Sequence, residues 1–577
     1  MVATLSFEKM FRKRIVFLTI LFLLCLLMII LRLAYMQIWH QDQYQAMADG
    51  QRTTGQTLWA TRGEIKIWDS FTNQPYTIAT TDEKVMVFVN PSAVTNKDEV
   101  VQKLSEITQI PKEEILEKIS DSSKKYVVIK KSLSEDEQNK IKDANLTGVG
   151  FDSETTRLYP EGAMLAQLLG FVGYREDKRA GVYGLELAFE KELAGKPGYL
   201  LQEKDNSGRW IFGSKRDRVP AIDGDSLMLT IDKTIQLQVD KILKAAVNDN
   251  EADSGSVIVM DPKTGAIMAM STYPDFNLNE YSKVENPNMY VNQVTQGAYE
   301  PGSIFKPLTM AASVNEGKIT ANTTYVDTGE VNIDGYTIKN SDEKAHGTQT
   351  MSQVLEQSLN TGTIFAKEAI GNKKFLEYLQ RFGFGKKVGF EVSENPGDIS
   401  NLLQGNIKVN YDTASFGQGI SVTPLQMVQA FSAISNGGKM LKPYVVKEII
   451  RQDGKVEEVG KTEATSVISA KAASEVAAML VNVVEKGHGK KAAVPGYYIA
   501  GKTGTAQVPR KDGKGYEENN NIGSFIGFGP VEDPRFIILV RINHPRTVKF
   551  AETTAAPAFG QIAQFLIQHF KLPPTRK

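Results

Sequence analysis

The sequence predicts a multidomain α/β protein. It predicts a single N-terminal transmembrane helix, then an α+β domain at residues 39–224, then a domain at residues 225–577 with an antiparallel sheet flanked by helices. Three observations lead to this fold class: a long apolar run near the N-terminus, short strand and helix patterns that alternate in the middle, and apolar strand patterns at both ends of the last region. The 577 residues are enough for two or more domains.

Residues 15–38 predict the membrane anchor. Ile15–Leu31 is an uninterrupted apolar run, and apolar residues resume after Arg32. A membrane span needs roughly 20 mostly apolar residues, which this segment provides when the Arg32 side chain reaches the interface. Basic residues precede the run at Lys9, Arg12, Lys13 and Arg14. The positive-inside rule therefore predicts a cytoplasmic tail at residues 1–14. It also predicts that the anchor lies in the cell (inner, cytoplasmic) membrane and that the chain after the anchor lies on the outer side of this membrane.

A cleaved signal peptide is the alternative interpretation of this segment. Ala46-Met47-Ala48 supplies a cleavage-like pattern, but it lies well beyond the apolar run. The run is also longer than the roughly 7–15 apolar residues of a signal peptide. We therefore expect an uncleaved single-pass anchor.

Residues 39–224 alternate between strand and helix patterns. "KVMVFVNP" and "KYVVIKKSL" predict strands. "NKDEVVQKLSEITQI" predicts a helix, with Asn96 as its N-cap and apolar residues at helical spacing. "PKEEILEKIS" predicts another helix, with Pro111 as its first residue. Charged helices over short strands indicate a spacer or docking domain.

Residues 225–577 predict an antiparallel sheet whose strands come from both ends of the region. "GSVIVMDPKTGAIMAMSTYP" has two apolar strands joined by turn residues, and such a short connection requires antiparallel pairing. Further strands are predicted in "YYIAGKTGTAQV", "NIGSFIGFGPV" and "RFIILVRIN". Helical patterns lie between them, including "TPLQMVQAFSAISNGG", whose paired glycines predict a C-terminal stop.

The amino-acid composition limits the partners and the kinds of catalysis that the protein can use. Lys+Arg and Asp+Glu balance at 67 each, so no basic excess indicates a nucleic-acid partner. The 5 histidines show no metal-binding spacing, and the 1 cysteine, Cys25, cannot form an internal disulfide or a cysteine-based zinc site. We therefore expect no metal and no cofactor. Catalysis would use hydroxyls, amines or carboxylates.

Three short motifs predict the site. They are Ser303-x-x-Lys306, Ser358-Leu359-Asn360 and Lys502-Thr503-Gly504, the last followed by Thr505. Each is weak alone, because S-x-x-K is often a helix start with a solvated lysine, S-x-N a cap or turn, and K-T-G any polar strand end. All three together, in this order and these contexts, predict a serine nucleophile that acts on a carbonyl.

The first motif supplies a nucleophile and its base. Spacing of three residues places Ser303 and Lys306 on one face of a helix, and Pro307 requires that the helix begin close by. The serine needs a base, and Lys306 can serve only when it is neutral, so its pKa must fall. Burial and a second cation both lower a lysine pKa, and Lys502 would be that cation.

The other motif residues would bind substrate and move protons. Asn360 offers an amide that donates to and accepts from a substrate peptide group, and Ser358 can relay a proton between the lysines and the leaving amine. Gly504 would let a substrate backbone lie against the strand edge. The side chains expected to hold a substrate carboxylate are those of Lys502, Thr503 and Thr505. Backbone N–H groups of Ser303 and Thr505 would form the oxyanion hole.

Longer segments carry a family resemblance. "RLYPEGAMLAQLLGFVG", "GVYGLELAFEKELAGKPG", "YEPGSIFKP", "SFGQGISVTPLQMVQAFSAISNGG" and "AGKTGTAQ" resemble class B penicillin-binding proteins, which are monofunctional peptidoglycan D,D-transpeptidases. The resemblance implies that residues 39–224 are an extracytoplasmic pedestal (dimerisation-like) domain. It implies that residues 225–577 are a penicillin-binding, serine β-lactamase-like transpeptidase domain. After "RGEI" the family's Asp-Arg-Asn-Gly is missing, which affects a pedestal turn only.

The resemblance also implies an activity and partners. Ser303 would be acylated by the D-Ala-D-Ala end of one peptidoglycan stem peptide, and an amine of a neighbouring stem would resolve the acyl-enzyme into a crosslink. β-Lactams would acylate Ser303 stably. Ser415-Phe416-Gly417-Gln418-Gly419 is more similar to division-type than to elongation-type enzymes, which implies septal cell-wall synthesis. The implied partners are the membrane, a polytopic glycosyltransferase and other divisome proteins.

Other functions stay open at the level of sequence. A D,D-carboxypeptidase would use water as the acceptor, and the motifs do not distinguish it. A β-lactamase would need a glutamate that activates the deacylating water, and none is recognisable between the second and third motifs. A non-catalytic penicillin-binding scaffold would be expected to lose Ser303, Lys306 or Lys502. Glu300 is expected to be a surface or loop carboxylate, and Arg157-Leu158-Tyr159-Pro160 is expected to hold the pedestal together.

Overall fold

The computed structural model describes residues 22–24, 26–35, 53–175, 178–203, 217–405, 407–510, 515–548 and 550–576. The chain divides into two compact units, Met1–Thr61 with Gly195–Asp223, and Arg62–Ala194 with Gly224–Lys577. The first unit contains a three-stranded antiparallel sheet in the order β1-β8-β9. Its strands are β1 (Thr53–Leu58), β8 (Gly198–Glu203) and β9 (Asp217–Val219).

The predicted anchor at residues 15–38 lies partly outside the described residues. Residues 22–24 and 26–35 are helical, and their side chains are mostly exposed. Within the part of the chain that the structure describes, no helix is long and apolar enough to cross a membrane. The transmembrane helix and the cytoplasmic tail at residues 1–14, which is outside the described residues, remain predictions.

The second unit contains a seven-stranded mixed sheet. Six strands follow the order β19-β18-β10-β2-β3-β4, and β5 pairs with β3. The strands are β2 (Ile65–Asp69), β3 (Gln74–Val89), β4 (Val127–Lys130), β5 (Val149–Leu158), β10 (Ser226–Asp232), β18 (Val446–Ile450) and β19 (Val456–Glu458). Because β10 pairs with β2 on one side and β18 on the other, this sheet crosses the domain boundary predicted at residue 224.

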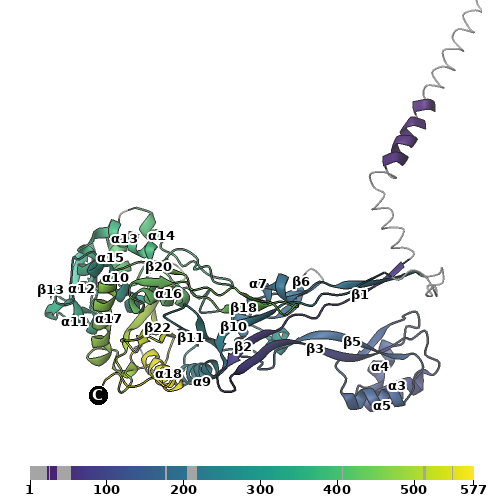
Figure 1. Cartoon of the computed structure of the whole chain (residues 1–577). Coiled ribbons are helices and arrows are strands. Elements are labelled where there is room, and N and C mark those ends of the chain that lie inside the picture. Colours follow the sequence, from purple (N-terminus) through teal and green to yellow (C-terminus); the bar gives the residue numbers. More distant parts are fainter. Residues whose placement is uncertain are drawn as a thin grey trace, which may run out of the picture. The chain divides into compact units, whose positions relative to one another are not determined.

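Three helices pack beside the far ends of β3 and β5 (Figure 1). They are α3 (Lys97–Thr108), α4 (Lys112–Lys118) and α5 (Glu135–Asp143). Asn96 accepts a hydrogen bond from Glu99 N, which confirms its predicted N-cap role. Pro111 is the N-cap of α4 and not its first residue, a shift of one position from the prediction. Val100, Val101 and Leu104 form a separate apolar core with β3 and β4.

The five-stranded sheet is antiparallel throughout, as the sequence predicts. Its order is β12-β11-β23-β22-β21, so strands from both ends of the region lie side by side. The strands are β11 (Ser254–Met260), β12 (Ile267–Tyr273), β21 (Ala500–Pro509), β22 (Tyr516–Gly529) and β23 (Phe536–Asn543). β21 is an edge strand, and it carries the third motif.

Helices cover both faces of this sheet. On one face, α9 (Lys233–Asp249) and α18 (Ala555–His569) share an apolar core with alternate strand residues such as Val257 and Val259. On the other face, the intervening residues such as Ile258 join a larger core. That core includes α10 (Lys306–Asn315), α11 (Met351–Glu356), α12 (Asn360–Glu368), α13 (Gly371–Arg381), α15 (Lys408–Ser415), α16 (Pro424–Ser435) and α17 (Ala470–Glu485). The three motifs meet on this second face.

A buried carboxylate holds the predicted pedestal together. Glu186 lies in α7 (Gly184–Ala188), and its side chain is fully buried. Its two carboxylate oxygens accept from Arg62 Nε at 2.6 Å and from Arg157 Nε at 2.7 Å. The side chain of Arg157 is only 3% exposed. The Arg157–Pro160 segment therefore has the structural role that the sequence predicts.

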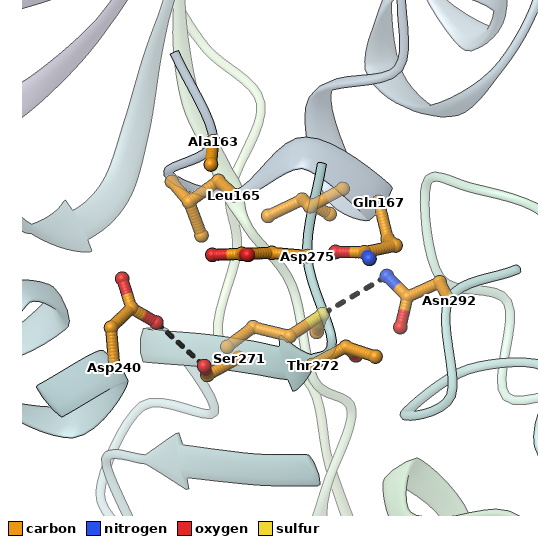
Figure 2. A pocket seen from close by; sticks show the side chains of 10 residues that line it. Ala163, Leu165, Gln167, Asp240, Ser271, Thr272, Asp275 and Asn292 are labelled. Carbon is orange, nitrogen blue, oxygen red and sulfur yellow. Dashed lines mark hydrogen bonds between the residues drawn. The ribbon is translucent and has the colours of Figure 1, made fainter. Parts of the chain in front are cut away.

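A small hollow lies between α9, β12 and residues 163–168 (Figure 2). Its volume is about 10 Å³, roughly the space of one water molecule. The carboxylates of Asp240 and Asp275 line it, and Asp240 accepts from Ser271 Oγ at 2.5 Å and from Gln236 Nε2 at 2.8 Å. Burial raises the pKa of Asp240 from 3.8 to about 6. Burial also raises the pKa of Asp275.

Asp240→Asn is expected to stabilise the fold at alkaline pH. A raised pKa means that the folded state binds the proton more tightly, so this contribution to stability is complete below about pH 3.8 and is lost as the pH rises through about 6. Asparagine keeps an acceptor oxygen and cannot ionise. The free energy of unfolding should therefore rise by about 1–3 kcal/mol at pH 8 and change less at pH 4. Urea denaturation measures both, with the exposed Asp249→Asn as the control. Equal effects of Asp240→Asn at both pH values would contradict the assignment.

Candidate active site

The serine motif lies where a short 3-10 turn passes into a helix. The turn is η4 (Gly302–Phe305), and α10 begins at Lys306 with Pro307 in its first turn. This confirms the predicted helix start, because proline lacks an N–H and fits only where no helical hydrogen bond is lost. Ser303 is half-buried, whereas Lys306 is fully buried.

The two lysines meet at one hydroxyl. Lys306 Nζ lies 3.3 Å from Ser358 Oγ and also donates to the carbonyl oxygen of the same residue. Lys502 Nζ donates to Ser358 Oγ at 2.9 Å and to Thr503 O at 3.0 Å. Residues from three distant parts of the sequence therefore form one array. Among the described residues, no hydrogen bond joins this array to Ser303 Oγ; catalytic hydrogen bonds are often longer without substrate.

Burial lowers the pKa values of both amines in this array. The pKa of Lys306 lies well below 10.5, first because the side chain is desolvated and second because the charge of Lys502 is close. Burial lowers the pKa of Lys502 to about 7. Within the part of the chain that the structure describes, no carboxylate forms a hydrogen bond with either amine. This arrangement favours a neutral Lys306, the protonation state that a general base requires.

Ser358 has an uncommon backbone conformation. It lies in the turn between α11 and α12, and its φ is +60°, in the left-handed region that side chains rarely adopt. The residue is 9% exposed. Its carbonyl and its hydroxyl both contact Lys306, so the turn aims both oxygens at the buried amine. Strained residues that are held in this way are frequent at functional sites.

Asn360 begins α12, two residues after Ser358. Its Nδ2 donates to the carbonyl oxygen of Lys339 at 2.8 Å. The side chain is half-buried, and within the described residues its Oδ1 has no protein partner. One N–H and the oxygen of this amide therefore stay available to a substrate.

The third motif lies on the edge strand β21. Thr503 is 7% exposed, and its Oγ1 lies 3.4 Å from Lys502 Nζ. Thr505 is exposed, and its Oγ1 accepts from Ala551 N at 3.2 Å. Lys502 and Gly504 are two residues apart, so they face the same side of the sheet as Ser303 and α10.

Gly504 is needed for a reason that the motif does not indicate. A Cβ at this position would lie 2.9 Å from Ile304 Cγ2 and 2.9 Å from Ser524 Oγ. The missing side chain therefore makes room for the serine turn itself. The predicted contact between Gly504 and a substrate backbone stays a prediction.

Glu300 joins the serine turn to two other segments. Its carboxylate accepts from Gly419 N at 3.0 Å and from Tyr516 Oη at 3.1 Å. It is a loop residue, as expected, but burial raises its pKa, so it is not a solvated surface carboxylate. Gly417 completes this contact, because its carbonyl accepts from Gly302 N at 3.0 Å. The "SFGQG" segment thus lies directly against the serine motif.

The sequence predicts no metal ligands. Among the described residues, no group of three or more His, Cys, Asp or Glu side chains could hold a metal ion.

Known proteins share this fold and these segments. Residues 255–564 match the family model of the penicillin binding protein transpeptidase domain, and residues 57–229 match that of the penicillin-binding protein dimerisation domain. The chain belongs to the penicillin-binding protein family. This penicillin-binding protein is 32% identical over 572 residues to Stage V sporulation protein D of Bacillus subtilis, covering 98% of this chain and 87% of the relative.

Two further comparisons cover most of the penicillin-binding protein. It is 30% identical over 573 residues to the probable peptidoglycan D,D-transpeptidase PbpC of Pseudomonas aeruginosa, covering 97% of this chain and 96% of the relative. It superposes on the crystal structure of penicillin binding protein 2X from Streptococcus thermophilus with a TM-score of 0.77 and 26% identity, covering 89% of this chain and 80% of that one. The pedestal and the transpeptidase domain thus share one fold with known family members.

Proposed function

We propose that this penicillin-binding protein is a serine-type peptidoglycan D,D-transpeptidase that acts through an acyl-enzyme on Ser303. The buried Lys306–Ser358–Lys502 array carries the proposal, because it supplies a base next to the serine turn. Lys306 can act as that base because its pKa lies well below 10.5. Relatives named peptidoglycan D,D-transpeptidase support the substrate class.

The acylation step follows from these positions. Ser303 Oγ attacks the carbonyl carbon of the penultimate D-Ala, and its proton passes to Lys306 Nζ. The peptide C–N bond then breaks. The proton moves from Lys306 through the Ser358 hydroxyl to the leaving amine, which departs as D-Ala. Lys502, Thr503 and Thr505 hold the terminal carboxylate, and the amide of Asn360 binds the peptide group of the donor.

The second step regenerates the enzyme. The amine of a neighbouring stem peptide attacks the ester carbon, and one of its protons passes to Lys306. The ester C–O bond breaks, and Ser303 Oγ recovers the proton from Lys306. A new peptide bond joins the two stems. A β-lactam resembles the donor and, after its ring opens, leaves a stable acyl group on Ser303.

The cellular setting is part of the proposal. Residues 15–38 would anchor the enzyme in the cytoplasmic membrane, with the N-terminus in the cytoplasm and the pedestal and catalytic domain outside. A polytopic glycosyltransferase and other divisome proteins would be its partners. The resemblance of Ser415–Gly419 to division-type enzymes supports a septal role. The relative named Stage V sporulation protein D supports cell-wall synthesis during sporulation as a second setting. A fluorescent fusion that localises to division septa, or only to developing spores, distinguishes the two.

A labelled penicillin tests the nucleophile. The full chain in detergent is incubated with the penicillin, and intact mass with peptide mapping locates the adduct. We expect one stable adduct on Ser303 that Ser303→Ala abolishes. Rapid turnover of the penicillin would instead indicate a β-lactamase. No adduct on folded protein would overturn the proposal in favour of a non-catalytic scaffold.

A donor–acceptor assay tests the acceptor. A D-Ala-D-Ala stem peptide is supplied with and without a second stem that carries a free amine. A transpeptidase releases D-Ala and forms the crosslinked dimer. Release of D-Ala without any dimer would assign a D,D-carboxypeptidase.

A further inference from the structure

A buried carboxylate lies beneath the second motif. Asp327 ends β13 (Thr324–Asp327), and its side chain is fully buried. Its oxygens accept from Thr361 Oγ1 at 2.7 Å, from Asn340 Nδ2 at 2.9 Å, from Gly329 N at 3.1 Å and from His346 N at 3.0 Å. A carboxylate only accepts, so all these contacts use it in its charged form. These hydrogen bonds keep the pKa of Asp327 below its ordinary value despite burial.

The network fixes the first turn of α12. Thr361 follows Asn360 directly; its hydroxyl donates to Asp327 and lies 3.1 Å from Tyr325 Oη. Its backbone N–H donates to Asn340 Oδ1 at 3.3 Å. A helix start has N–H groups without intrahelical partners, and here Asn340 caps one of them from a distant loop. Asp327 holds Asn340 in that place.

The same loop fixes the amide of Asn360. Its Nδ2 donates to the carbonyl of Lys339, the neighbour of Asn340. The amide is therefore oriented by its own backbone position at the start of α12 and by the 339–340 segment. Both depend on the carboxylate of Asp327, which bonds to Thr361 on one side and Asn340 on the other. A shift of about 1 Å in such a group can lower a rate roughly 10²-fold.

We propose that Asp327 is a positioning residue of the active site: through Thr361 and Asn340 it orients the Asn360 amide toward the peptide group of the acyl donor. This inference rests on the proposed function of Ser303 and Asn360. It predicts that Asp327 matters for donors that present an acylamino group to Asn360 and matters little for donors without one.

Two β-lactams that differ in this group test the proposal. Benzylpenicillin carries an acylamino side chain, whereas 6-aminopenicillanic acid has a free amine in its place. The second-order rate of acylation of Ser303 is measured for both with the full chain in detergent. Asp327→Asn replaces one carboxylate oxygen with an NH₂ group, which is a donor and cannot accept the hydrogen bonds of the network. We expect it to slow acylation by benzylpenicillin about 10- to 100-fold and to slow acylation by 6-aminopenicillanic acid much less.

A milder pair of variants tests the Thr361 hydroxyl alone, which contacts Asp327, Asn340 and Tyr325. Thr361→Val has nearly the same volume without the hydroxyl, and Thr361→Ser restores the hydroxyl. We expect the valine variant to show the same selective loss and the serine variant to recover most of the benzylpenicillin rate. The matched control is Glu343→Gln, because Glu343 lies in the same loop and its side chain is exposed. Its rates should be those of the wild type.

A double-mutant cycle separates positioning from a general loss of structure. If Asp327 acts through the amide, Asn360→Ala removes the same benefit, so Thr361→Val should add little to it. Equal losses for both β-lactams, or losses that add to those of Asn360→Ala, would overturn the proposal. Absence of any Ser303 adduct in the wild type would instead overturn the proposed function, so the two failures are distinguishable.

Discussion

Replacing Lys306 with methionine is expected to slow acylation of Ser303 by about 10²- to 10⁴-fold, the usual contribution of a general base. Methionine fits the buried position without an amine, so Ser303 keeps its place and loses only its proton acceptor. The alternative base is Lys502, but its Nζ already donates to Ser358 Oγ and to Thr503 O. Stopped-flow acylation by a chromogenic β-lactam measures the loss.

The pH profile makes this prediction specific. The pKa of Lys306 is lowered by burial and by the charge of Lys502, so the amine is neutral above that pKa and protonated below it. The wild-type rate should therefore rise with pH through the lowered pKa, and this limb should vanish in Lys306→Met. Lys318→Met is the control, because Lys318 is exposed just beyond α10. A rising limb that persists in Lys306→Met would show that another group is the base.

The chemistry of the site could be predicted because its residues lie in short motifs. Ser303 and Lys306 are three residues apart at a helix start that Pro307 marks, and the structure has that helix start. The antiparallel sheet followed from two apolar runs joined by one short turn, since so short a connection requires antiparallel pairing. Lys502 lies at the site because the edge strand on which it stands pairs next to β22.

The residues that hold the site in place could not be predicted, because they act through contacts between segments that are distant in the sequence. Asp327 and Thr361 are 34 residues apart, and Glu300 and Tyr516 are 216 apart. A lone Asp or Glu in a loop has no periodicity that distinguishes a buried, structural carboxylate from a solvated one. The motif predicts that Gly504 lies at the substrate edge, and that stays a prediction. Only the packed structure shows that the missing side chain also makes room for Ile304.

Glu186→Gln is expected to lower the free energy of unfolding by about 3–5 kcal/mol. The variant keeps the shape of the side chain but leaves the buried guanidinium of Arg157 without its counter-charge and removes one of the two carboxylates that pair with Arg62. Breaking a buried ion pair on one side costs about this much. Despite burial, the carboxylates of Glu186 and Glu190 keep the pKa of Arg62 above its ordinary value. A guanidinium does not lose its proton in proteins, and Glu190 remains in the variant, so Arg62 stays charged there. Urea denaturation of the full chain measures the loss.

Glu190 provides the matched control for this network. Its carboxylate also pairs with Arg62, at 2.6 Å, but its side chain is 31% exposed. Water can replace a partner at such a position, so Glu190→Gln is expected to cost about 1 kcal/mol or less. The difference between the two losses measures the effect of burial, because both variants remove one negative charge next to the same arginine. Equal and small losses would mean that water reaches Arg157 in the folded pedestal. In that case apolar packing around Leu185 and Tyr159, rather than the ion pairs, would hold this part of the pedestal together.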